Sequence, residues 1–233
     1  MKSKYKTALI VGAGDGLSAS VARAFAAAGM RSALAARTPG KLTALAKELD
    51  ACAIECDASD RAQVAKMFAR ADEFFGAPPD VVVYNPSFRV RGSIVDVDAD
   101  AVAKALSVSA YGGFLVAQLA AQRMVPRGSG AILFTGASAS IKGYPLSAAF
   151  AMGKFALRGL AQSIARELAP KGVHVAHFVI DGGIRGPRHV EQPDAPDSTL
   201  DPDAIARSYL HVLEQDRSAW TGELELRPWV EKF

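Results

Sequence analysis

The stretch that decides the fold is VGAGDGLS at residues 11–18, which lies between an apolar run at residues 7–11 and an Ala-rich segment at residues 19–29. The apolar run predicts a strand, and the spacing of the Ala-rich segment predicts a helix. In a glycine loop at such a junction, backbone N–H groups can approach a pyrophosphate, which the positive end of the helix also attracts. The stretch therefore predicts a dinucleotide-binding turn formed by Gly12, Gly14, Gly16 and Leu17.

The spacing of these glycines matches the known patterns only in part. In a GxGxxG pattern the third glycine would fall at Leu17, whereas a GxxxGxG pattern finds Gly12 and Gly16 but has Ser18 in its last place. A plain strand-to-helix turn is the alternative interpretation. The position of the turn at the first strand-to-helix junction favours dinucleotide binding.

Strands and helices alternate along the rest of the chain. Apolar runs at residues 32–36, 52–56, 81–83, 131–135, 173–180 and 224–226 predict strands, and helical spacing predicts helices at residues 41–49, 61–75, 99–124 and 148–168. Continuous apolar strands separated by helices indicate a parallel sheet that is covered on both faces. We expect a single α/β domain over residues 1–233, a Rossmann-type doubly wound parallel sheet with helices on both faces.

One long segment breaks this alternation. Residues 185–202 contain four prolines among Arg, His, Asp and Ser, which is loop composition. Asp201 and Pro202 then predict the start of a helix that ends near Gln215. We expect residues 185–215 to form a lid on the substrate side of the site.

Composition and charge exclude several classes of partner. Half of the residues are hydrophobic and 22% are charged, as in a folded globular protein. The formal net charge is only +3 and no clustered basic stretch follows the first six residues, so we expect no nucleic-acid partner. The uncharged run at residues 105–122 is near the length of a membrane span, but its Ser, Gly and Gln residues suit a packed helix, and we expect no membrane partner. Cys52 and Cys56 have no His nearby, which predicts neither a disulfide framework nor a metal site and indicates a cytoplasmic protein.

The residues after the second strand bear on the choice of cofactor. About 20 residues beyond the glycine loop, Ala36 stands where an acidic residue would bind the 2′-hydroxyl of NAD. The next residue is Arg37, whose guanidinium can form charge-assisted bonds to a 2′-phosphate. Against this, Asp15 in the same loop would repel that phosphate, and Arg37 can also be a solvated turn residue. The balance favours NADP over NAD.

Over nearly its whole length the chain resembles the short-chain dehydrogenase/reductase family. Besides the glycine turn, the motifs that carry the resemblance are Asp57 after the third strand, YNPS at residues 84–87, FAMGK at residues 150–154 and the stretch at residues 173–184. The resemblance implies that Asp57 holds the adenine amino group and that Asn85 supports the cofactor cleft. It also implies that Lys154 binds the nicotinamide ribose, and that Ile184, after Gly182, abuts the nicotinamide amide.

The chain departs from this family at the catalytic positions. The family has a Tyr that exchanges a proton with the substrate oxygen, four residues before the Lys, and Phe150 stands there. The family Ser maps to Ala137, with Ser138 adjacent, and the family Asn maps to Ser109. Loss of one general acid typically costs ~10²–10⁴ in rate. Hydride transfer between correctly held partners can survive this loss, because the nicotinamide carries the chemistry.

The candidate catalytic residues are therefore Lys154, Ser138 and Tyr144. Tyr144 precedes the helix of Phe150, where its alternative role is an amphipathic wall of the cleft; Ser147 and a water are further candidates. His174 and His177 lie in the strand at residues 173–180, where a buried imidazole bonded to a backbone carbonyl is favoured over a proton shuttle. Trp220 and Trp229 are interpreted as packing or subunit-contact residues.

Together these features predict an NADP(H)-dependent short-chain oxidoreductase with an altered proton donor. It would act on a carbonyl or alcohol group of a small molecule. The alternative is a nicotinamide-cofactor-binding protein without dehydrogenase turnover, acting as a sensor or a partner subunit. A scaffold indifferent to nucleotides would leave the glycine loop unexplained. The resemblance further suggests a homodimer or homotetramer built from the helices at residues 99–124 and 148–168.

Overall fold

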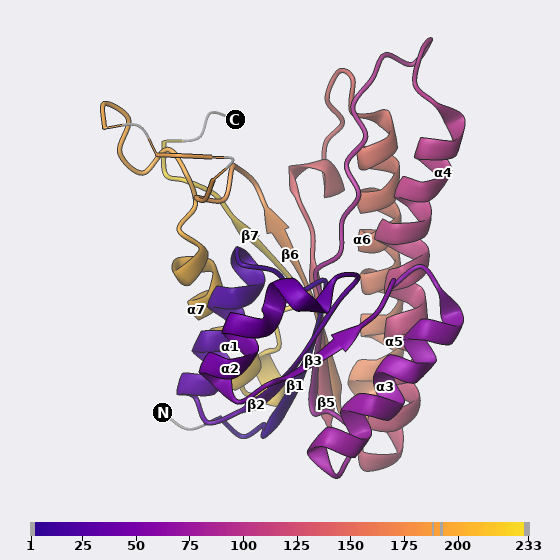
Figure 1. Ribbon diagram of the computed structural model, residues 1–233, viewed down its shortest axis with the longest axis vertical. Coiled ribbons are helices and arrows are strands. Elements are labelled where there is room, and N and C mark those ends of the chain that lie inside the picture. Colours follow the sequence, from indigo (N-terminus) through magenta and orange to yellow (C-terminus); the bar gives the residue numbers. More distant parts are fainter. Residues whose placement is uncertain (1–2, 188, 192, 231–233) are drawn as a thin grey trace.

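A single parallel sheet forms the centre of the protein in the computed structural model, which describes residues 3–187, 189–191 and 193–230. Within these residues the sheet has seven strands in the order β3-β2-β1-β4-β5-β6-β7. The strands are β1 (Thr7–Val11), β2 (Arg31–Ala36), β3 (Cys52–Glu55), β4 (Val81–Tyr84), β5 (Gly130–Thr135), β6 (Val173–Ile180) and β7 (Glu223–Leu226). This arrangement confirms the predicted doubly wound parallel sheet (Figure 1).

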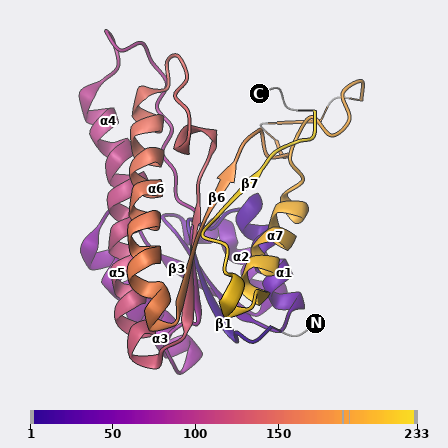
Figure 2. The same ribbon diagram turned by 180° about the vertical axis from the view of Figure 1, so that it is seen from behind.

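Helices cover both faces of the sheet (Figures 1 and 2). One face carries α1 (Leu17–Ala27), α2 (Thr43–Leu49) and α7 (Pro202–Glu214), and the other carries α3 (Arg61–Phe75), α4 (Ala99–Leu106), α5 (Gly112–Met124) and α6 (Ala148–Leu168). Each face of the sheet has its own hydrophobic core. In β1, Ala8 and Ile10 pack into the core with α1 and α7, while Leu9 and Val11 pack into the core with α3, α5 and α6. Because successive side chains of a strand point to opposite faces, a sheet covered on both faces needs the continuous apolar strands seen in the sequence.

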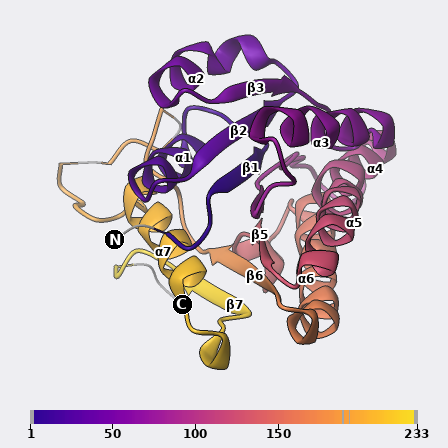
Figure 3. The same ribbon diagram turned by 90° about the horizontal axis from the view of Figure 1, so that it is seen from below.

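The direction of the chain reverses at the centre of the sheet. From β1 it runs outward through β2 to β3, and then returns to place β4 on the other side of β1 (Figure 3). The backbone N–H of Asn85 after β4 donates to the carbonyl of Val11 at 2.9 Å, which joins the segment after β4 to the glycine turn. Ligands of such sheets bind at the carboxyl ends of the strands beside this reversal.

The single helix expected at residues 99–124 is wrong in one respect. A π-helical segment, Ser107–Tyr111, separates α4 from α5, with the N–H of Gly112 bonded to the carbonyl of Ser107. The buried hydroxyl of Tyr84 donates to the carbonyl of Val108 in this segment. A Cβ atom on Gly112 would lie 2.5 Å from that hydroxyl oxygen, so glycine permits the close approach. The expected helix at residues 41–49 also begins differently, as a 3₁₀ turn at Pro39–Leu42.

Among the residues that the structure describes, the stretch Ala99–Arg127 is long and apolar enough to cross a membrane by length and composition alone. The core helix of a globular protein passes the same test. Leu115, Val116 and Ala120 of this stretch are buried in the core beneath the sheet.

The expected lid divides into two parts. Residues 202–214 form α7, whose Ile205, Tyr209 and Leu213 are buried in the core with α1. The expectation of a lid is therefore wrong for this part, because the apolar face of the helix is part of the sheet's own packing. Residues 185–201 remain the lid candidate, although positions 188 and 192 lie outside the described residues. The base of the segment is closed by backbone bonds from Arg185 N–H to the Leu200 carbonyl and from Leu200 N–H to the Gly183 carbonyl, both 2.8 Å.

Candidate active site

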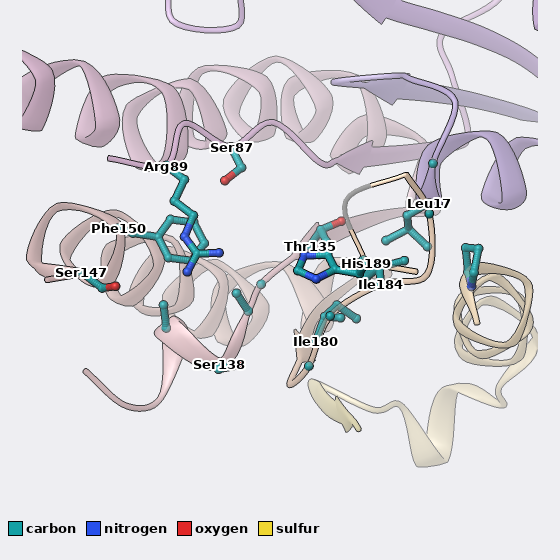
Figure 4. Close-up of a pocket in the computed structure, with 18 of the residues that line it drawn as sticks. Leu17, Ser87, Arg89, Thr135, Ser138, Ser147, Phe150, Ile180, Ile184 and His189 are labelled. Carbon is teal, nitrogen blue, oxygen red and sulfur yellow. The ribbon is translucent and has the colours of Figure 1, made fainter. Parts of the chain in front are cut away.

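Two cavities lie at the carboxyl ends of the strands, and Asp15 and Ser87 line both of them. The smaller, of about 370 Å³, contains five of the residues predicted from the sequence: Gly12, Gly14, Arg37, Asp57 and Asn85. The larger, of about 1410 Å³, is lined by further residues singled out in the sequence: Gly16, Leu17, Ser138, Tyr144, Ser147, Phe150, Gly182 and Ile184. Figure 4 shows Leu17, Ser138, Ser147, Phe150 and Ile184 around this cavity. Lys154 lines neither cavity.

The glycine turn requires glycine at one position above all. Gly12 has a φ of +77°, and a Cβ atom there would lie 2.6 Å from the backbone nitrogen of Pro86. A Cβ atom on Gly14 or Gly16 would meet no atom within 4 Å. Helix α1 begins after Gly16 with no side-chain cap and no acidic residue in its first turn. The N–H of Ala19 donates to the Gly16 carbonyl at 2.9 Å, which leaves the N–H groups before Ala19 for an anion. The turn fits the pyrophosphate of a dinucleotide.

Asn85 braces this turn from the neighbouring strand. Its side-chain amide donates to the hydroxyl of Ser18 at 2.7 Å and to the carbonyl of Gly12 at 3.3 Å. The Ser18 hydroxyl in turn donates to the same carbonyl at 3.2 Å. The network links β4 to the glycine turn, as expected of a residue that supports the cleft.

Asp57 presents an ionised carboxylate to the smaller cavity. It accepts hydrogen bonds from the backbone and the hydroxyl of Ser59 at 2.9 and 2.6 Å, and Lys104 lies 3.4 Å away. Although burial raises the pKa of Asp57, the bonds from Ser59 and Lys104 outweigh it and hold this pKa below its usual range. An ionised carboxylate is an acceptor suited to an amino group.

Lys154 is buried beneath the site. Its side chain is only 2% exposed, its ammonium donates to the carbonyl of Thr135 at 2.8 Å, and burial lowers its pKa to about 8. Phe150, one helical turn earlier, lines the larger cavity, and the centre of its ring lies 5.9 Å from the Lys154 nitrogen. The contact of Lys154 with a nicotinamide ribose stays a prediction.

Ser138 and Tyr144, the two candidate residues with a hydroxyl group, both line the larger cavity but have different neighbours. Burial raises the pKa of Asp181, and hydrogen bonds from Ser138 and Lys142 more than offset it, so that this pKa is lowered. Tyr144 is 47% exposed, and the ammonium of Lys142 lies 5.8 Å from its ring centre. Ser109, at the family Asn position, is buried and lines neither cavity.

The two strand histidines have different partners. His174 lies 2.9 Å from the carbonyl of Thr221 and stacks on Trp220, which matches the structural interpretation of both residues. His177 instead contacts side chains, with Glu223 at 3.1 Å from one ring nitrogen and the Ser140 hydroxyl at 3.4 Å from the other. Burial lowers the pKa of His177 to about 4, against the opposing effect of Glu223.

The low pKa of His177 predicts a loss of stability in acid. Between about pH 6.5 and 4 the unfolded chain protonates this imidazole while the folded protein does not, so the free energy of unfolding falls as pH falls through this window. We expect the wild-type protein to lose up to about 3 kcal/mol more than the His177→Gln variant between pH 7 and 4, measured by urea unfolding. Identical pH dependence of the two proteins would contradict the assignment.

Three basic residues are among the cavity residues that the sequence interpretation missed. Lys41 joins Arg37 in the smaller cavity, and Arg89 and Arg91 line the larger one. The guanidinium of Arg89 lies 5.4 Å from the centre of the Phe150 ring. The two arginines lie shortly after the YNPS motif that follows β4. The position of that motif beside the chain reversal points to this segment, but not to which of its side chains face the cavity.

Comparisons with known proteins relate most of the chain to dehydrogenases. Residues 6–190 match the model of a family described as short chain dehydrogenase. A short-chain dehydrogenase/reductase of Armillaria gallica is 32% identical over 196 residues, which cover 80% of this chain and 74% of the relative. A 3alpha-hydroxysteroid dehydrogenase of Mediterraneibacter gnavus is 30% identical over 175 residues, which cover 71% of this chain and 69% of the relative. The crystal structure of a short-chain dehydrogenase from Rhodopseudomonas palustris has a TM-score of 0.83 and 34% identity, covering 96% of this chain and 99% of that one.

Proposed function

Because the chain belongs to the short-chain dehydrogenase family, whose members bind a nicotinamide cofactor and act on small molecules, we propose that it is an NADP(H)-dependent oxidoreductase with an altered proton donor. The reaction proposed is the interconversion of a carbonyl compound and an alcohol. The observation that carries the proposal is the pair of cavities that meet at the glycine turn, one suited to the adenosine half of a dinucleotide and one open to a substrate. Similarity to named dehydrogenases favours turnover over the alternative of a binding protein without it.

Two cations support NADP as the cofactor. Arg37 and Lys41 both line the smaller cavity, and Ala36 precedes them where NAD-binding chains carry an acidic residue. Asp57 in the same cavity is already partnered by Ser59 and Lys104. Asp15 in the same lining would repel a 2′-phosphate, but the two positive charges of Arg37 and Lys41 exceed its single negative charge.

The residues of the larger cavity would orient the substrate and leave the proton to another group. A bound nicotinamide supplies or accepts the hydride. Phe150 offers an apolar wall but no proton, whereas Ser138 and Tyr144 carry hydroxyl groups in the same lining. We assign protonation of the substrate oxygen to a water in this open cavity, to Ser138 or to Tyr144, with Lys154 holding the backbone of Thr135 in place through its hydrogen bond.

The choice of cofactor is tested by titrating the protein with NADPH and NADH. We expect NADPH to bind at least about tenfold more tightly, because one charge-assisted contact is worth roughly 1.5–3 kcal/mol. In Arg37→Gln this preference should shrink to a few-fold, while NADH affinity stays unchanged. A wild-type protein that binds both cofactors equally would contradict the assignment of Arg37.

Turnover is tested by following NADPH oxidation with a panel of carbonyl compounds. Oxidation with at least one compound is expected. Tight NADPH binding without oxidation by any of them would favour the binding-protein alternative, and absence of binding to both cofactors would contradict both.

Assembly, location and lid complete the proposal. Tyr111 and Phe114 are exposed and stacked, with ring centres 6.4 Å apart, and Met152 and Phe155 are exposed on α6. These apolar side chains support a homodimer or homotetramer built through the long helices.

Two free cysteines are consistent with the cytoplasm. Residues 185–201 serve as the substrate-side lid.

A further inference from the structure

The larger cavity carries positive charge that the described part of the chain does not neutralise. Three arginines line it. Arg185 is paired with Glu191 at 2.7 Å and with Asp201 at 3.3 Å, whereas Arg89 and Arg91 form no ion pair with any residue that the structure describes. Among the described residues, Asp15 at the glycine turn is the only carboxylate in the lining.

Arg89 is held in a geometry that leaves its hydrogen-bond donors available. Figure 4 shows its side chain reaching from the segment after β4 to the Phe150 ring, and the guanidinium lies 5.4 Å from the ring centre. A guanidinium that rests on an aromatic ring is stabilised by the ring's negative face. Its N–H groups point outward in the guanidinium plane, in the fork that matches a carboxylate.

The backbone that carries the two arginines is fixed on both sides. Before them, the N–H of Asn85 donates to Val11 at 2.9 Å; after them, the N–H of Gly92 donates to the carbonyl of Leu146 at 3.0 Å. Leu146 itself has a φ of +63°, a left-handed conformation that is costly for a residue with a side chain. Such fixed attachment reduces the entropy lost when a ligand is bound.

We infer that Arg89, assisted by Arg91, binds a carboxylate of the substrate, so that the site takes oxo acids and hydroxy acids in preference to their neutral analogues. The inference rests on the proposed oxidoreductase function and adds the substrate class. In the reduction, the carbonyl carbon gains the hydride of NADPH and its oxygen gains a proton from water, giving a hydroxy acid, NADP⁺ and hydroxide. The carboxylate is unchanged and serves only as the anchor.

The test compares benzoylformate with methyl benzoylformate, which share a carbonyl group and differ in the charge of the acid. Calorimetry with the NADP⁺-loaded protein measures binding without turnover. We expect the acid to bind at least about tenfold more tightly than the ester, as a charged hydrogen-bond pair would give. Arg89→Gln should remove this preference and leave ester binding unchanged, and Arg89→Lys should restore part of it, because lysine keeps the charge but not the fork.

Arg70→Gln is the matched control, because it removes the same charge from α3, outside both cavities. It should leave the preference for the acid intact. Equal binding of acid and ester, or equal effects of Arg70→Gln and Arg89→Gln, would overturn the inference. Failure of the proposed function is distinguishable: Arg89-dependent binding of the acid without NADPH oxidation would count against the oxidoreductase alone, and oxidation of NADPH with both compounds at equal kcat/KM would count against the carboxylate site alone.

Discussion

Phe150→Tyr is expected to raise kcat for carbonyl reduction by about 10²-fold, the lower part of the range that a general acid contributes. The substitution adds a phenol to a side chain that already lines the larger cavity, one helical turn before Lys154. The ring keeps its size and its contact with Arg89, so folding and substrate binding should change little. The measurement is the rate of NADPH oxidation at saturating substrate.

Phe150→Leu is the control for this gain. It replaces the ring with an aliphatic side chain that supplies no proton donor, and we expect its kcat to be no higher than that of the wild-type protein. If Phe150→Tyr were no faster than wild type, the proton would already reach the substrate by an efficient route, and the proposal of an altered and slower donor would fail.

Gly12→Ala is expected to abolish measurable NADPH binding and to lower the free energy of unfolding by about 2 kcal/mol or more. The new methyl group would lie 2.6 Å from the backbone nitrogen of Pro86, on a residue whose φ is +77°. Because Pro86 is backbone-bonded through its neighbour Asn85 to β1, the turn itself must move, and the contacts of Asn85 with Ser18 move with it. Urea unfolding and fluorescence titration measure the two effects.

Gly14→Ala separates binding from stability. No atom lies within 4 Å of the Cβ position at Gly14, so the free energy of unfolding should stay within about 0.5 kcal/mol of the wild-type value. Cofactor affinity should still fall, because Gly14 lines the smaller cavity. A loss of stability in Gly14→Ala as large as that in Gly12→Ala would show that the contact with Pro86 is not the cause.

The regular elements were predictable because the helices carry a periodic apolar pattern and the buried strands are continuous apolar runs. In α3 the apolar positions Val64, Met67, Phe68 and Ala71 recur at helical spacing, and these residues are the buried face of that helix. The bounds of α6 and β6 also agree with the sequence. The π segment at Ser107–Tyr111 was not predictable, because it depends on a hydrogen bond from Tyr84, a residue on another strand.

The site was predictable where a motif fixes the backbone and not where tertiary contacts decide. Gly12, Asn85 and Arg37 lie in one cavity because each directly follows a neighbouring strand. Arg89 and Arg91 lie in a segment without periodicity, where only the folded chain shows which side chains face the cavity. The burial of Lys154 could likewise not be inferred from its spacing to Phe150. The catalytic roles of Lys154, Ser138 and Tyr144 stay predictions.

The backbone bonds that close the base of the segment at residues 185–201 bear on how freely the length of this segment can change. Arg185 is joined to Leu200 by a backbone hydrogen bond and also pairs with Asp201, so contacts between the ends themselves hold the two ends of the segment together. Lengthening a loop whose ends already meet costs only about 0.6 kcal/mol for each doubling of its length. We therefore expect changes in the length of this segment to leave the rest of the fold intact.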